Sequence, residues 1–154
     1  MSSLLHARCH VCGQPVGNPQ RSFDRRIATL GTTRHDGALV TTCNIVFDEA
    51  LYLYCSDACW DVHQALITSA LGLVHTYPAT NFVTPCCRCG KPVDRTEPHV
   101  AYVITVTRIA DEGILMGYCL DDRDFAVLCH DCERPEPVQE EDATSLPLDV
   151  EAIA

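Results

Sequence analysis

The spacing of paired cysteines constrains this chain more than any other feature of its 154 residues. Eleven cysteines are present, and most of them fall into pairs separated by two or three residues. The pairs are Cys9/Cys12, Cys55/Cys59, Cys86/Cys89 and Cys129/Cys132. Patterns of this kind are typical of disulfide frameworks in secreted proteins and of metal sites in reduced proteins.

Two features favour metal binding over disulfides. An odd number of cysteines does not suit a closed disulfide framework, and the N-terminus lacks the charged segment and apolar run of a secretory signal. We therefore expect reduced thiols and a cytoplasmic location. No stretch approaches the roughly 18 consecutive apolar residues that span a membrane, so no membrane segment is expected.

An internal repeat organises the chain. The sequence Cys-His-Val-Cys-Gly-Gln-Pro-Val at residues 9–16 returns at residues 86–93 as Cys-Cys-Arg-Cys-Gly-Lys-Pro-Val, an offset of 77. A looser repeat relates residues 51–59 to residues 125–132. We therefore predict a first cysteine unit at 1–72, a linker at 73–85, a second unit at 86–132 and a disordered acidic tail at 133–154.

Within each unit the sequence predicts a β-hairpin between the two cysteine pairs. Runs 23–30 and 39–47 flank His35-Asp36-Gly37, a hairpin signal, and a short strand at 51–54 leads into the second pair. In the second unit we expect strands at 100–108, 114–120 and 125–128. The strands after Tyr102 and before Cys43 could pair into one sheet.

A helix should follow only the first unit. Ser56 is a suitable N-cap, and an apolar face then recurs at helical spacing until Gly72 can end the helix. That face consists of Trp60, His63, Ile67, Ala70 and Leu71. The expected fold class is small α+β, stabilised by zinc, with two repeated knuckle–hairpin–knuckle units.

Each unit offers four thiolates, which is the ligand set of a structural zinc ion. The first set is Cys9, Cys12, Cys55 and Cys59, and the second is Cys86, Cys89, Cys129 and Cys132. We predict two Zn²⁺ ions. Pairing of cysteines across the two units and an iron–sulfur cluster are the alternatives.

Three cysteines and one histidine remain outside this scheme. Cys43 and Cys119 are expected to be buried on equivalent strands, with a redox or reserve-ligand role as the alternative. Cys87 competes with Cys86 for the first position of a knuckle, but Cys86 has the better spacing. His63 could reach the first metal from the helix, and we prefer a packing role for it.

The first unit resembles a treble-clef zinc finger. The string Tyr54-Cys55-Ser56-Asp57-Ala58-Cys59-Trp60 is similar to the signature of TRASH and MYM-type fingers. That resemblance implies metal binding together with protein contacts or metal sensing. The second unit resembles a zinc ribbon, which implies a docking role in transcription or translation machinery.

We do not expect an enzyme. Four thiolates saturate a zinc ion and leave no position for a catalytic water. Pro85-Cys86-Cys87-Arg88-Cys89 matches half of the nucleobase deaminase motif, but no His-x-Glu or Cys-x-Glu precedes it. Phosphate-binding and hydrolase motifs are also absent from the sequence.

The predicted function is that of a protein-interaction adaptor or regulator. Its partner would be another protein, one that is basic or belongs to the transcription machinery, because the net charge is −10 and the tail is acidic. A metal or redox sensor that uses the extra thiols is one alternative. Nucleic-acid binding is disfavoured by the charge, but a basic strip could support it. That strip consists of Arg21, Arg25, Arg26 and Arg34.

Overall fold

The computed structural model describes residues 7–74 and 81–135. Its elements are β1 (Gln20–His35), β2 (Ala38–Tyr54), α2 (Asp57–Ala70), β3 (Val83–Pro85), β4 (Pro92–Asp94), β5 (His99–Asp111) and β6 (Leu115–Leu128). Within the described ranges, no helix is long and apolar enough to cross a membrane. Most of the predicted tail and the middle of the predicted linker lie outside the described residues, and the division into two units stays a prediction.

Both hairpins turn where the sequence predicts. Asp36 and Gly37 have φ values of 52° and 81°, which is the left-handed region that a tight turn between β1 and β2 requires. Gly113 has a φ of 94° between β5 and β6. The Asp-Gly hairpin signal is confirmed, although β1 and β2 are longer than the predicted runs.

The two hairpins join into one antiparallel sheet with the strand order β2-β1-β5-β6. The central strands pair from Gln20–Thr107 to Ala28–His99. The expected α+β fold of two hairpin units is therefore wrong. The chain is mostly β, because the hairpins share a single long sheet, while β3 and β4 form a small second sheet.

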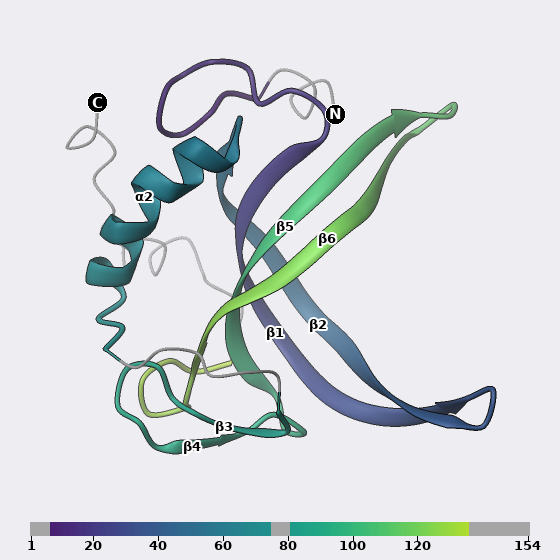
Figure 1. Cartoon of the computed structure of the whole chain (residues 1–154), viewed down its shortest axis with the longest axis vertical. Coiled ribbons are helices and arrows are strands. Elements are labelled where there is room, and N and C mark those ends of the chain that lie inside the picture. The colour runs from purple at the N-terminus through teal and green to yellow at the C-terminus, as the bar shows by residue number, and fades with distance from the viewer. Residues whose placement is uncertain (1–6, 75–80, 136–154) are drawn as a thin grey trace.

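Only the inner part of each hairpin lies in the shared sheet. Because β1 and β5 run antiparallel, their outer ends leave the shared sheet at its two ends and diverge, the β1–β2 tip toward the lower right and the β5–β6 tip toward the upper right of Figure 1. We call residues 29–46 the first arm and residues 108–120 the second arm. Residues 32–46 of the first arm are exposed, whereas the paired centre of β1 and β5 is buried.

The shared sheet retains an approximate two-fold symmetry. Each hairpin has two β-bulges four residues apart, after Phe23 and Ile27 in the first and after Tyr102 and Val106 in the second. Asp24 follows the first bulge of the first hairpin, and Val103 follows the first bulge of the second. These two residues pair directly with each other across the β1–β5 seam. The sequence repeat thus corresponds to two hairpins related by an axis through the β1–β5 seam.

Helix α2 closes one side of the core, as its sequence predicts, although Ala70 of the predicted apolar face is exposed. The Ser56 hydroxyl accepts a hydrogen bond from the backbone N–H of Cys59 at 3.2 Å. Trp60 and Ile67 are buried, and the Trp60 ring stacks on Phe23, with 5.7 Å between centroids. Phe23 also stacks on Tyr102 from the second hairpin at 5.4 Å. One aromatic cluster therefore holds the two repeats together.

Candidate metal centres and the polar face of the sheet

The structure gathers the predicted ligands into two separate tetrads. The first consists of Cys9, Cys12, Cys55 and Cys59, and the second of Cys86, Cys89, Cys129 and Cys132. Within each tetrad all four sulfur atoms lie within 4.8 Å of one another. No tetrad mixes the two repeats, so the crossed pairing is not the one that forms.

The first tetrad is built by a knuckle, the end of β2 and the start of α2. The backbone N–H of Cys9 donates to Gln14 O at 2.7 Å, and that of Gly13 donates to Cys9 O at 3.0 Å. Gly13 accepts a positive φ of 76°, which this tight turn requires. The N–H of His10 donates to Leu53 O at 2.8 Å and attaches the knuckle to β2.

The second tetrad repeats this backbone scheme. Cys86 donates to Lys91 O at 2.7 Å, and Gly90, with a φ of 82°, donates to Cys86 O at 2.9 Å. The N–H of Cys87 donates to Val127 O at 2.9 Å, as His10 does to Leu53. Cys87 is thus a buried residue of the knuckle and no member of the tetrad.

The sulfur positions fit one tetrahedral metal ion in each tetrad. A tetrahedron with metal–sulfur bonds of about 2.3 Å has sulfurs roughly 3.8 Å apart. The Sγ–Sγ distances are 3.5 Å for Cys12–Cys55 and 3.7 Å for Cys55–Cys59. In the second tetrad they are 3.7 Å for Cys86–Cys132 and 3.5 Å for Cys89–Cys129. A multi-iron cluster needs more space between the sulfurs than these distances leave.

The electrostatics of the second tetrad favour a cation. Burial raises the pKa of Cys86, but N–H groups of Cys89, Cys129 and Arg88 outweigh burial and lower that pKa to about 6. Burial and the neighbouring thiols raise the pKa of Cys132 to about 12. Four adjacent thiols cannot all ionise without a positive charge among them, and a divalent metal ion supplies that charge.

The first tetrad shows the same asymmetry. Burial opposes ionisation of Cys9, but N–H groups of Cys12, Cys55 and Val11 lower its pKa to about 7. The pKa of Cys59 rises to about 12, first through burial and then through the neighbouring thiols. Each tetrad can therefore hold one metal ion, with the first cysteine of the knuckle ionising most readily.

His63 lies outside the first tetrad and packs in the core. Its Nδ1 is 2.6 Å from the Tyr54 hydroxyl, and the ring is fully buried beside His10 and Tyr52. Burial, followed by the charge of His10, lowers the pKa of His63 to about 4. The packing role predicted for His63 is the one that the structure shows.

The four arginines of the predicted basic strip do not form one surface. Arg25 is buried and bonds Glu133 at 2.6 Å, and Arg26 is buried between two carboxylates. Arg21 pairs with Asp57 at 2.7 Å, and Arg34 lies exposed near the tip of the first arm. The two central guanidinium groups are thus occupied by acids of the chain itself.

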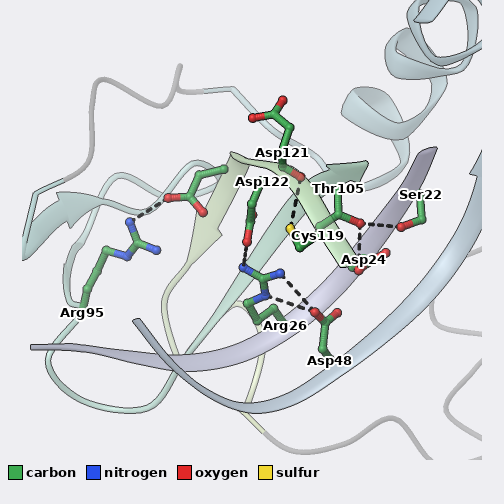
Figure 2. Close-up of polar contacts among 10 residues, drawn as sticks. Ser22, Asp24, Arg26, Asp48, Arg95, Thr105, Cys119, Asp121 and Asp122 are labelled. Atoms are coloured by element: carbon green, nitrogen blue, oxygen red, sulfur yellow. Dashed lines mark hydrogen bonds and ion pairs between the residues drawn. The ribbon is translucent and has the colours of Figure 1, made fainter. Parts of the chain in front are cut away.

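The face of the sheet opposite α2 carries a polar network, which the sequence interpretation missed (Figure 2). Arg26 contacts Asp48 on β2 at 3.1 Å and Asp122 on β6 at 2.7 Å. One side chain from a central strand therefore joins both edge strands, which requires a strongly curled sheet. Arg95, also buried, pairs with Asp124 at 3.1 Å beside this network.

Asp24 is the least compensated member of this network. Its Oδ2 accepts from Thr105 at 3.4 Å, and within the described residues its buried Oδ1 has no hydrogen-bond partner. Burial raises the pKa of Asp24, a hydrogen bond from Ser22 opposes the rise, and the charge of Asp48 adds to it, giving a pKa of about 7. The alternation of Ser22, Asp24 and Arg26 along β1 was the sequence signal for this face.

The predicted burial of Cys43 and Cys119 is wrong. Both are exposed, on β2 and β6, because they lie in the arms outside the shared sheet. Cys43 and Cys119 also occupy different positions in their hairpins. Cys43 pairs with Leu30, the third residue after the second bulge of its hairpin, whereas Cys119 pairs with Thr107, the first residue after the corresponding bulge. Partial burial raises the pKa of each thiol, so neither is an activated nucleophile.

No protein-family model matches the chain, and searches of curated proteins and of solved structures found no match. The order of knuckle, hairpin and helix at residues 9–70 is the order that the treble-clef resemblance implies. That resemblance, like the one to zinc ribbons, stays a prediction.

Proposed function

We propose that this protein is a non-enzymatic adaptor in which two zinc ions hold a pair of projecting β-arms for contact with another protein. One observation carries the proposal. Each hairpin is closed at its base by a complete cysteine tetrad, while its outer part extends beyond the shared sheet and exposes apolar side chains. The exposed residues are Leu39, Val40, Ile45 and Val46 on the first arm and Ile114, Met116 and Leu120 on the second.

The chemistry of the tetrads supports a structural role for the metal. Zinc with four thiolates has no open coordination position and cannot present a water molecule or a substrate. The contribution of the metal is to fix the knuckles against β2 and β6, and hence to fix the base of each arm. The partner should present a basic surface, since the chain has 21 acidic residues against 11 lysines and arginines.

The sensor and nucleic-acid alternatives have less support. Cys43 and Cys119 lie outside both tetrads and have raised pKa values, which makes them slow to oxidise. Arg25 and Arg26 are engaged by buried or half-buried carboxylates, so contact with phosphate would first require breaking those ion pairs.

Photo-crosslinking tests the adaptor function. A benzoylphenylalanine placed at Ile114, in the second arm, should give one defined protein adduct in cells. The same residue placed at Val62, an exposed apolar position on α2, is the matched control. We expect the Ile114 adduct to disappear when Cys89→Ser opens the second tetrad. Adducts that are equal at both positions, or none from the arm, would contradict the proposal.

A further inference from the structure

The outer edge of β2 has no strand partner among the described residues, and its regular segment, residues 38–45, lacks the features that usually protect such edges. β2 is the last strand of the sheet, and among residues 7–74 and 81–135 its outer part pairs only with β1. From Ala38 to Phe47 it has neither a charged residue nor a proline. Exposed edges normally carry charges or proline, because an unpaired row of backbone N–H and C=O groups invites another strand.

The opposite edge provides an internal comparison. β6 is the other edge strand, and it carries four consecutive charged residues at 121–124. Its uncharged outer part, 115–120, is shorter and is interrupted by Gly117. In the first arm eight successive uncharged residues, 38–45, precede the β-bulge at Val46 and are available for pairing. A two-stranded ribbon of this kind is only marginally stable alone.

The side chains of this edge match a second copy of themselves. When one strand pairs with its own copy about a two-fold axis, the sequence numbers of two opposite residues must differ by an even number. The reason is that the backbone N–H and C=O groups point toward the neighbouring strand only at alternate residues. Val46 is the bulged residue of β2 and has no partner on β1, so regular alternation ends at Ile45. An axis at Thr42 stays within the regular segment and places Leu39 opposite Ile45, whereas an axis at Cys43 would place Val40 opposite the bulged Val46. The arrangement about Thr42 is therefore the better match.

We propose that two copies of this protein associate through antiparallel pairing of their β2 edges, centred on Thr42. The occupant of the edge is thus a second copy, in an isologous contact that closes on itself and leaves no further free edge there. Residues 38–47 are uncharged, so the contact brings no like charges together although each chain has a net charge of −10. The proposal does not depend on the adaptor function, because it concerns the β2 edge alone and the crosslinking test of the adaptor function uses the second arm.

The affinity should be modest. An edge contact of about eight residues per copy buries less than the roughly 1,200 Å² of a standard interface. We therefore expect a reversible monomer–dimer equilibrium in the micromolar range. The two copies would form one sheet of eight strands, with their metal tetrads distant from the contact.

Sedimentation velocity of the full, zinc-loaded chain over a concentration series tests this proposal. We expect the mass to double at high concentration. Thr42→Lys, which places two positive charges next to each other at the axis, should weaken association at least tenfold. Thr33→Lys makes the same exchange on β1 of the same arm, away from the β2 edge, and should leave association unchanged. Equal zinc content and circular dichroism of the variants verify that they fold.

A short bismaleimide crosslinker provides a second measurement. Zinc-loaded protein should yield a covalent dimer that is lost in Cys43→Ser and retained in Cys119→Ser. A monomer at every concentration, or a dimer that survives Thr42→Lys, would overturn the proposal. It would also be overturned if the edge were crosslinked only to a different protein.

Discussion

Replacement of Asp24 by asparagine should make the protein more stable at neutral and basic pH. Asp24 is only 7% exposed, its Oδ1 has no partner among the described residues, and Asp48 lies close enough to oppose its ionisation. Its pKa is about 7, against 3.8 as the ordinary value. Folding therefore requires this carboxyl to retain a proton that the unfolded chain has lost.

The sign and size of the effect follow from these two pKa values. The penalty begins near pH 4, grows as the pH rises, and is complete above pH 7, where it reaches about 4 kcal/mol as an upper value. Between pH 6 and pH 8 the wild type should lose about 1 kcal/mol that Asp24→Asn does not lose. The amide keeps the shape of the side chain and cannot ionise.

Urea unfolding of both proteins at pH 6, 7 and 8 measures this difference. The comparison at each pH cancels the effect of pH on metal binding, which the two proteins share. Asp61→Asn, an exposed acid on α2, controls for the loss of one negative charge. An Asp24→Asn effect that is the same at pH 6 and pH 8 would refute the reasoning, because Asp24 would then not titrate in this range.

Three further substitutions test the remaining parts of the structure. Cys129→Ser should reduce the metal content from two ions per chain to one, while Cys43→Ser should leave it at two, as read by elemental analysis. Arg26→Gln leaves two carboxylates, Asp48 and Asp122, without their counter-ion and should cost about 3 kcal/mol in urea unfolding; a loss below about 0.5 kcal/mol would contradict the assigned ion pairs. Trp60→Ala should cost about 3–5 kcal/mol through lost packing, while Val62→Ala, exposed on the same helix, should change stability by less than about 0.5 kcal/mol.

Local signals in the sequence predicted local structure well. The Asp36-Gly37 turn, the helix that begins after Ser56 and the burial of Trp60 and Ile67 all follow from short-range rules. The cysteine spacing also predicted which thiols the structure brings together. These features depend on a few neighbouring residues, so a single sequence is enough to specify them.

The long-range arrangement was harder to predict. β2 is one strand and not two, because bulges near Phe47 and Ala50 absorb the irregular residues without ending the pairing. The Arg25–Arg26 pair suggested a surface, yet both side chains are buried by carboxylates that lie far away in the sequence. A buried ion pair depends on which strands become neighbours, and no local pattern encodes that.

X-ray absorption spectroscopy of the metal, combined with metal counting on protein purified under reducing conditions, tests the central claim most directly. We predict two zinc ions per chain, each surrounded by four sulfur atoms at about 2.3 Å and retained in the presence of a mild chelator. A single ion per chain, a nitrogen or oxygen ligand in the coordination shell, or iron in place of zinc would contradict two closed zinc centres at the bases of the hairpins.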